Sequence, residues 1–203
     1  VVGWVGGGEN TAVNDFLVGY IDGVNYVDPS IEVLYSYVGD WTNSAKATEL
    51  ANAQYDMGAD VIFAVAGGAG FGACESAAAT GHYAFGVDTD FAGQLEQSGS
   101  ATADYVVSSA IKQFGKVVYD AMVKFYNGEL EFGKHTSCDV SSGYLEMLET
   151  KQFEKIVKEG MPDVYKRYTE ICQDLKDGKI EVGTAVGATP EYVAQKKAEA
   201  AAH

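Results

Sequence analysis

Short apolar runs alternate with stretches of helical periodicity along the first 130 residues, and this alternation constrains the fold more than any other feature. Strands are expected at residues 1–5, 31–38, 61–66, 83–87 and 105–107. Helices are expected at residues 11–26, 43–57, 70–80 and 109–126. Strands that alternate with helices predict an α/β fold with a doubly wound parallel sheet and right-handed crossovers. The run at 61–66 is apolar throughout, which is typical of a parallel strand buried on both faces.

The pattern changes after Gly128. Here we expect a strand at 143–148, amphipathic helices at 151–158 and 162–176, and a short strand at 179–184. Thr189 and Pro190 predict the start of a last helix, since a capping hydroxyl precedes a proline at the first helical position. We therefore divide the chain into an α/β lobe at residues 1–128 and a second set of segments at residues 129–203.

The charge balance restricts the class of partner. The chain carries 14 basic and 29 acidic side chains, a net charge of -15. Such a surface repels phosphate backbones and anionic lipid, which argues against nucleic acid or a bilayer as a direct partner. No apolar run approaches the roughly 20 residues that a membrane span needs. The three cysteines are widely spaced, so the sequence predicts neither a disulfide framework nor a zinc ribbon.

Glycines and polar or aromatic residues follow every expected strand. After the successive strands come Gly6-Gly7-Gly8-Glu9-Asn10, then Gly39-Asp40-Trp41-Thr42-Asn43, then Gly67 to Gly72, then Asp88-Thr89-Asp90, and then Ser108-Ser109 with Lys112 one turn further on. Open α/β sheets bind ligands in the crevice outside the carboxyl ends of their strands. The sequence therefore predicts a binding pocket at this edge of the sheet.

Each of these residues also has a purely structural interpretation. The glycines at 6–8 can be a tight turn, whereas the run at 67–72 is denser than a turn needs and lets backbone N–H groups approach a ligand. It does not match the spacing of a dinucleotide-binding fingerprint. Trp41 can lie in the core, but its polar loop favours a flat stacking platform. Asp88 can cap a helix or accept sugar hydroxyls, and Lys112 can be a solvated helix residue.

Catalytic and metal-binding patterns are absent from the sequence. The three histidines, His82, His135 and His203, have no clustered partners, and neither a nucleophile elbow nor a P-loop occurs. Asp88 and Asp90 are expected to point in opposite directions, because alternate residues of an extended segment do so. We therefore expect a protein that is not an enzyme and that uses no metal or cofactor.

Several motifs, in order and at matching spacing, resemble the basic membrane protein (BMP) family of ABC-transporter substrate-binding lipoproteins. They are Val2 to Gly7, Phe16 to Tyr20, Tyr37 to Trp41, Gly58 to Phe63, Ala66 to Gly70, Gly86 to Asp90 and Ser109 to Lys112, with a looser match at Gly178 to Val182. The resemblance implies a type I periplasmic-binding-protein fold, in which two α/β lobes close on a ligand, most often a purine nucleoside.

The resemblance also implies a role for particular residues. Trp41 matches an aromatic that stacks on the base. Gly67 and Gly68 match a loop whose backbone meets the ribose. Asp88 and Lys112 match a carboxylate and an ammonium that hydrogen-bond the ribose hydroxyls.

The family's N-terminal lobe, signal peptide and acylated cysteine have no counterpart in this sequence. The resemblance therefore implies the C-terminal portion of a receptor: one ligand-binding lobe, with residues 129–203 as crossover segments that pack on the other lobe. The full-length form is then expected to be an extracytoplasmic, membrane-anchored lipoprotein that delivers a nucleoside to an ABC transporter permease.

Three other interpretations use the same fold class. The ligand can be a free sugar, a flavin or a signalling molecule. The chain can be the effector lobe of a transcription regulator that resembles the lactose repressor, although the negative charge disfavours this. An NAD-dependent dehydrogenase is the weakest alternative.

Overall fold

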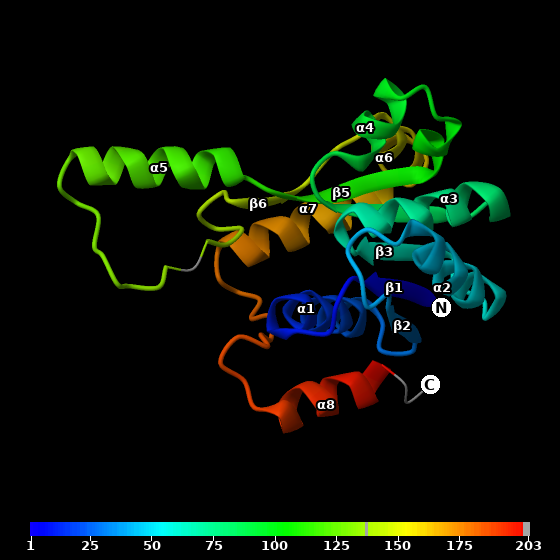
Figure 1. Cartoon of the computed structure of the whole chain (residues 1–203), viewed down its shortest axis with the longest axis horizontal. Coiled ribbons are helices and arrows are strands. Elements are labelled where there is room, and N and C mark those ends of the chain that lie inside the picture. Colours follow the sequence, from blue (N-terminus) through cyan, green and yellow to red (C-terminus); the bar gives the residue numbers. More distant parts are fainter. Residues whose placement is uncertain (137, 201–203) are drawn as a thin grey trace.

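A six-stranded sheet forms the centre of the protein, with strand order β2-β1-β3-β4-β5-β6 (Figure 1). The structure is a computed structural model that describes residues 1–136 and 138–200. The first five strands pair in parallel, and β6 joins the edge antiparallel to β5. This is the α/β, doubly wound arrangement predicted from the sequence. The strands are β1 Val2–Gly6, β2 Val33–Tyr37, β3 Val61–Val65, β4 Tyr83–Asp88, β5 Val106–Lys112 and β6 Leu145–Met147.

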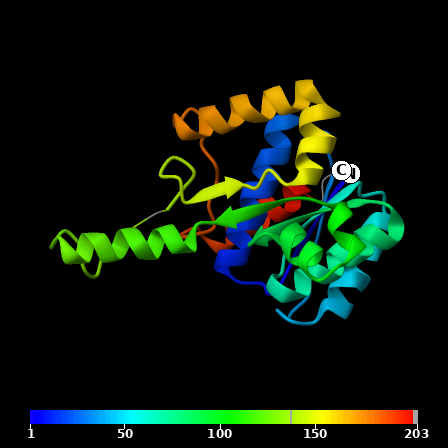
Figure 2. The ribbon, with the colours of Figure 1, turned by 90° about the horizontal axis from the view of Figure 1, so that it is seen from above.

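Helices cover both faces of this sheet (Figure 2). One face carries α1 (Thr11–Val27), α7 (Pro162–Lys176) and α8 (Pro190–Ala200). The other face carries α2 (Ser44–Asp56), α3 (Gly70–Thr80) and α4 (Phe91–Gln97). Short helical turns complete the structure: Gly67–Ala69, Ala101–Tyr105, α6 (Lys151–Phe153) and a π-helical turn at Glu154–Glu159, which continues α6 through most of the helix expected at 151–158.

Strand β3 shows why its sequence is apolar throughout. Phe63 points toward α1, where its ring centroid lies 6.3 Å from that of Phe16 and 5.7 Å from that of Tyr20. Ile62 and Ala64 point toward the α2–α3 face and are fully buried. Both faces of the strand pack against apolar side chains, which accounts for an apolar residue at every position.

Helices α2 and α3 approach closely because small residues line their contact. The hydroxyl of Thr48 donates to the carbonyl of Gly72 over 3.0 Å, and the hydroxyl of Ser76 donates to Asn52 Oδ1 over 2.6 Å. A Cβ atom on Gly72 would overlap the backbone carbonyl of Ser44. Glycine at position 72 is therefore a packing requirement of this helix pair.

The expected helix at 109–126 is wrong in its first turn. Residues 109–112 continue β5, and the helix α5 begins only at Phe114 (Phe114–Tyr126). Both serines of this strand are buried: Ser108 Oγ donates to the carbonyl of Leu148 over 2.7 Å, and Ser109 Oγ accepts from the N–H of Phe91 over 3.2 Å. Pairing with β4 and β6 thus overrides the local helical pattern, and the short strand expected at 105–107 is the start of this longer one.

The strand expected at 179–184 is also wrong, because side chains of α1 take the place of a neighbouring strand. Asp22 Oδ2 accepts from the N–H of Gly183 over 2.8 Å, and Asp15 Oδ1 accepts from the N–H of Ala185 over 2.7 Å. Lys196 of α8 then pairs with Asp22 Oδ1 over 2.7 Å. We call residues 183–200 the C-terminal strap, since these contacts hold the segment along α1.

Helix α5 projects away from the rest of the protein (Figure 1). None of its residues is buried, and one side carries apolar residues at intervals of four: Phe114, Val118, Met122 and Tyr126. Residues on both sides of Gly128 share the central sheet, since β6 pairs with β5. The proposed division at residue 128, with later segments packing on another lobe, stays a prediction. Among the described residues, no helix has both the length and the apolarity needed to cross a bilayer.

Replacing Gly72 by alanine should destabilise the protein by about 1–3 kcal/mol, because the added methyl group meets backbone that cannot move independently. The matched control is Gly23→Ala in α1, where nothing lies within 4 Å of the new methyl group. That change should stabilise the protein by about 0.5–1 kcal/mol, since alanine is the better helix former. Urea denaturation of both variants measures the two effects, and shifts of the same sign would contradict this account of the α2–α3 contact.

Candidate ligand-binding site

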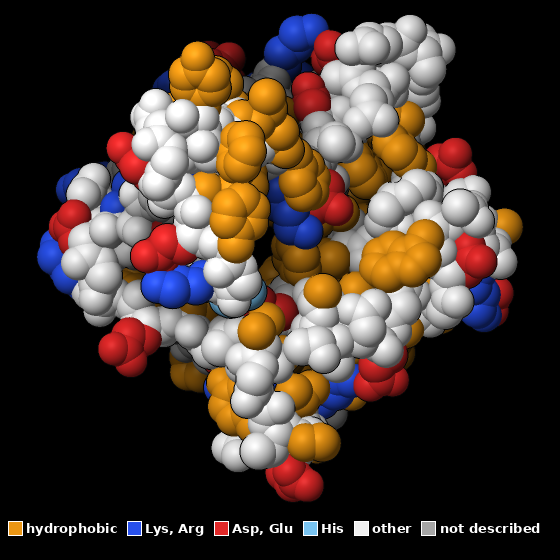
Figure 3. All heavy atoms as spheres, turned by 60° about the vertical axis from the view of Figure 1, so that its left-hand side comes forward, with side chains coloured by type: hydrophobic (Ala, Val, Ile, Leu, Met, Phe, Trp, Pro, Cys, Tyr) orange, Lys and Arg blue, Asp and Glu red, His pale blue; other side chains and the backbone are white. Residues whose placement is uncertain are grey.

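The five residues predicted to bind ligand lie at one edge of the sheet. Trp41 follows β2, Gly67 and Gly68 follow β3, and Asp88 and Lys112 are the last residues of β4 and β5. These strands are parallel, so their carboxyl ends share an edge. Figure 3 shows a hollowed side of the molecule, where hydrophobic side chains gather around a basic and an acidic group.

The ring of Trp41 packs against the backbone of Gly7 and Gly67. A Cβ atom on Gly7 would overlap its six-membered ring, and one on Gly67 would lie 3.5 Å from the same ring. The carbonyl of Trp41 accepts from the N–H of Ala69 over 2.9 Å, which ties the loop after β2 to the loop after β3. The side chain is nevertheless 47% exposed. The alternative of a core tryptophan is therefore wrong, and the ring leaves one side open to solvent.

Hydrogen bonds shape the loop that presents Trp41. Asp40 Oδ1 accepts from the N–H groups of Thr42 and Asn43 over 2.6 and 2.8 Å. These bonds, with one from the Thr42 hydroxyl, hold the pKa of the Asp40 carboxyl below its usual value. Asn43 caps α2, since its Oδ1 accepts from the N–H of Lys46 over 3.0 Å. The turn on either side of Trp41 is therefore built by side chains and keeps its form without a ligand.

Gly67 starts the turn Gly67–Ala69 that leads into α3. Its φ angle of 54° lies in the left-handed region, which glycine enters without the steric cost that a Cβ atom brings. Gly68 beside it is exposed. This loop thus lies at the start of a helix with its backbone open to solvent, as the predicted contact with a ligand requires.

Asp88 and Lys112 form an ion pair, with Nζ of Lys112 2.9 Å from Oδ1 of Asp88. The approach lies outside hydrogen-bond geometry, so Oδ1 accepts no hydrogen bond. Their side chains are 37% and 32% exposed, respectively. The pair joins the ends of two adjacent strands and keeps donor and acceptor capacity for a bound molecule.

Asp88 has an unusual backbone conformation. It is the one residue other than glycine with a positive φ, 65°, in the described part of the chain. The N–H of Thr89 donates to the carbonyl of Val87 over 2.7 Å, which closes a γ-turn around Asp88. A γ-turn with a left-handed central residue is rare and strained. Such strain persists where the surroundings enforce it and is concentrated at functional sites.

Asp90 has a separate role. Its Oδ1 accepts from the N–H of Gly93 over 2.8 Å and caps α4. The helix cap is therefore Asp90, two residues after Asp88. The two carboxylates serve different contacts, as expected from the sequence.

Lys112 also lies beside two aromatic rings. Its Nζ is 4.5 Å from the ring centroid of Phe16 in α1 and 5.9 Å from that of Phe114, the first residue of α5. Both distances lie within the range of cation–π attraction. The alternative of a solvated helix residue is wrong, because Lys112 is the last residue of a strand and is paired on several sides.

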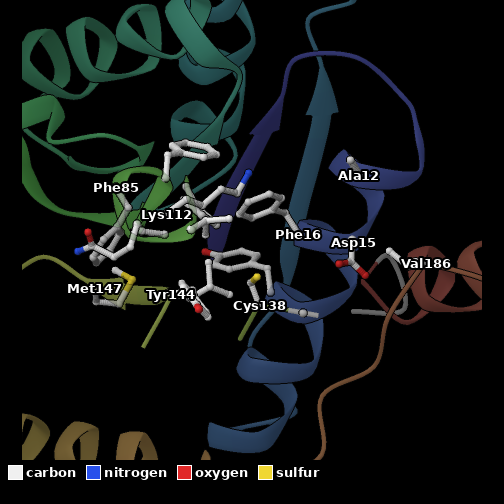
Figure 4. A pocket seen from close by; sticks show the side chains of 17 residues that line it. Ala12, Asp15, Phe16, Phe85, Lys112, Cys138, Tyr144, Met147 and Val186 are labelled. Carbon is white, nitrogen blue, oxygen red and sulfur yellow. The ribbon is translucent and has the colours of Figure 1, made fainter. Parts of the chain in front are cut away.

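A cavity lies beside this edge and shares only Lys112 with the predicted residues (Figure 4). Its volume is about 800 Å³, and most of its lining is apolar. Helix α1 contributes Phe16 and Tyr20, and the sheet contributes Phe63 and Phe85. Burial raises the pKa of the Tyr20 hydroxyl above its usual value.

The sequence analysis did not predict that these four aromatic residues line a cavity. Phe16 and Tyr20 lie four residues apart on one face of a helix, which is the ordinary pattern of a core face. Phe63 and Phe85 occupy register-paired positions on adjacent strands, and therefore share a face of the sheet. Their alignment with Lys112 depends on β5 reaching residue 112, which the helical pattern at 109–112 concealed.

His82 packs against an aromatic ring. The ring of His82 stacks on Tyr55, with centroids 4.6 Å apart and planes 13° from parallel. Within residues 1–136 and 138–200, no group of three or more histidine, cysteine or acidic side chains is arranged to hold a metal ion.

Solved structures that resemble this fold include solute-binding proteins and a regulator. An ABC-transporter solute-binding protein from Aeropyrum pernix K1 superposes with a TM-score of 0.76 at 20% identity, covering 98% of this chain and 62% of that one. A transcriptional activator of the comK gene from Bacillus halodurans gives 0.68 at 24% identity, covering 85% and 55%. At these identities the similarity shows the fold, which is that of periplasmic solute-binding proteins.

Sequence comparison places the chain within a family. Residues 1–181 match the Bmp model, described as ABC transporter substrate-binding protein PnrA-like. The chain therefore belongs to the Bmp family of ABC-transporter substrate-binding proteins, which confirms the predicted resemblance.

Two curated relatives illustrate the relationship. Basic membrane protein D of Borreliella burgdorferi is 30% identical over 184 residues, which are 89% of this chain and 51% of that protein. The ABC transporter nucleoside-binding protein BmpA of Lactococcus lactis is 28% identical over 191 residues, covering 89% and 52%. The chain thus spans about half the length of these relatives.

The strain at Asp88 predicts a stability order. Asp88→Gly should be more stable than Asp88→Ala by about 1–2 kcal/mol, because only glycine adopts the left-handed conformation freely. At Thr89, which has no positive φ, the order should reverse, with glycine less stable than alanine by about 0.4–1 kcal/mol. Chemical denaturation of the four variants tests this, and the same order at both positions would refute the γ-turn.

Proposed function

We propose that this lobe captures a nucleoside, with a preference for purines, as part of an extracytoplasmic solute-binding protein that serves an ABC importer. The observation that carries the proposal is the Asp88–Lys112 ion pair at the strand ends, on the same edge as the exposed, glycine-backed ring of Trp41. The name of the Lactococcus lactis relative, a nucleoside-binding protein, agrees with it.

The groups at this edge suit the two parts of a nucleoside: Trp41 suits the base, and the Asp88–Lys112 pair suits the ribose. The open side of Trp41 offers a flat surface for a base, and stacking of a base on an aromatic side chain contributes about 1–3 kcal/mol. The carboxylate of Asp88 accepts hydrogen bonds, and the ammonium of Lys112 donates them. Adjacent hydroxyls of a ribose both donate and accept, so they can satisfy both groups. The pair is neutral overall, which favours an uncharged ligand.

The remainder of the proposal concerns the full-length receptor. A second lobe would cover the open side of Trp41, and closure of the lobes would report the loaded state to a transporter permease. We place this receptor outside the cytoplasm, anchored to the membrane as a lipoprotein. Within it the lobe binds and releases its ligand without catalysis, cofactor or metal.

The preferred ligand class can be tested by titration with adenosine, guanosine, ribose and riboflavin. We expect weak binding, since one lobe leaves the outer side of a stacked base in solvent, and ligand-observed NMR detects such binding. Both purine nucleosides should bind more tightly than ribose, because ribose has no ring to stack on Trp41. Tighter binding of ribose or riboflavin would replace the nucleoside by a sugar or a flavin.

Trp41→Ala should weaken adenosine binding by about 1–3 kcal/mol, the contribution of one base stack. It should leave the affinity for ribose and the free energy of unfolding nearly unchanged, because the side chain lies half in solvent. Trp41→Phe is the matched control, since it keeps an aromatic face. Equal adenosine affinity in wild type and Trp41→Ala would exclude the stacking role.

Lys112→Met should reduce the protein's discrimination between ribose and dideoxyribose, while Asp88 still accepts from the hydroxyls. In the wild type, 2′,3′-dideoxyadenosine should bind about 1.5–3 kcal/mol more weakly than adenosine, which is the contribution of a hydrogen bond to a charged group. Lys151→Met, which removes an exposed lysine paired with Glu96, serves as the control and should keep the difference. If Lys112→Met keeps it too, Lys112 does not contact the hydroxyls.

A further inference from the structure

We propose that Phe16 is a positioning residue that fixes the ammonium of Lys112 over its ring face, and thereby sets the direction in which Lys112 donates to a ligand. The inference rests on the proposed function for its ligand, but its structural part stands on the lobe alone. Nζ of Lys112 lies 4.5 Å from the centroid of the Phe16 ring, within cation–π range.

The ion pair with Asp88 does not by itself fix the ammonium. A lysine side chain is a point charge on a flexible four-carbon stem, with three rotatable N–H donors. Both members of the pair are about a third exposed, and such pairs contribute little to holding a geometry. The contact also lies outside hydrogen-bond geometry, so it does not direct any one N–H group. A second contact is needed to define where the ammonium points.

Phe16 is well placed to supply that contact, because its own ring is held. It packs edge-on against Phe63 of the central strand β3, with centroids 6.3 Å apart and planes at 63°. Helix α1, which carries it, is fixed at its start by Asn10, whose Oδ1 accepts from the N–H of Val13 over 3.1 Å. The C-terminal strap holds the same helix through Asp15 and Asp22.

Phe114 has a weaker version of the same contact. Its ring centroid lies 5.9 Å from Nζ of Lys112, near the limit for cation–π attraction. The ring is 56% exposed and belongs to α5, which projects from the protein (Figure 1). Phe16, anchored in the lobe, is therefore the principal aromatic contact.

The ammonium group of Lys112 has a different neighbour on each of two sides. One side meets the carboxylate of Asp88 and another meets the ring of Phe16. An aromatic face attracts the charge and is a weak partner for an N–H group, so at least one strong donor stays available on the remaining side. That side is the direction in which a ligand hydroxyl would be bound.

The experiment combines an NMR signature with binding. In the complete chain, the Hε protons of Lys112, assigned by their loss in Lys112→Arg, should be shifted upfield by the ring current of Phe16. Phe16→Leu and Phe16→Met, two ring-free variants of similar volume, should abolish the shift, and Phe16→Tyr should keep it. Phe85→Leu is the matched control, since Phe85 lines the same cavity from β4 and its loss should leave the shift in place.

Adenosine affinity should fall about two- to fivefold in Phe16→Leu and Phe16→Met, the size expected of a partly exposed cation–π contact. It should return to the wild-type value in Phe16→Tyr. An unshifted Lys112 in the wild type, or equal effects of Phe16→Leu and Phe85→Leu, would overturn the positioning role. Failure of the wild type to bind adenosine would instead refute the proposed function, while the NMR shift still decides where Lys112 lies.

Discussion

Parallel pairing of the first five strands is the constraint on which the site depends. Because these strands run in one direction, the residues that end them share an edge, whatever their separation along the chain. Trp41 and Lys112 are thereby placed on the edge that also carries the glycine loop after β3. Helices can cover both faces of the paired strands for two reasons. Small residues let α2 and α3 pack closely, and β3 is apolar throughout.

Two glycines at the site make room for the ring of Trp41. Gly7 and Gly67 lack the side chains that would push the ring of Trp41 away, so the tryptophan lies flat on backbone while half exposed. The strained γ-turn at Asp88 has a comparable effect, since it departs from strand geometry at the residue that meets Lys112. Both features place a side chain at the edge of the sheet before any ligand arrives.

Periodicity was sufficient to predict the strands of the parallel sheet and most of its helices, but it did not predict α4. It failed where tertiary partners replace local preference. Residues 109–112 have a helical pattern but form the end of β5, because buried Ser108 and Ser109 bond to neighbouring segments. Residues 179–184 have a strand pattern but bond to carboxylates of α1. Phe16 looked like an ordinary core residue, because its contact with Lys112 exists only when β5 is extended.

The C-terminal strap has a consequence for the order in which the protein is made. Its bond between Gly183 and Asp22 joins residues 161 positions apart, so the contact cannot form until residue 183 has left the ribosome. Closing so long a loop is entropically costly and slow compared with local helix formation. Helix α1, and with it the aromatic wall beside Lys112, therefore gains this outer cover after its local contacts have formed.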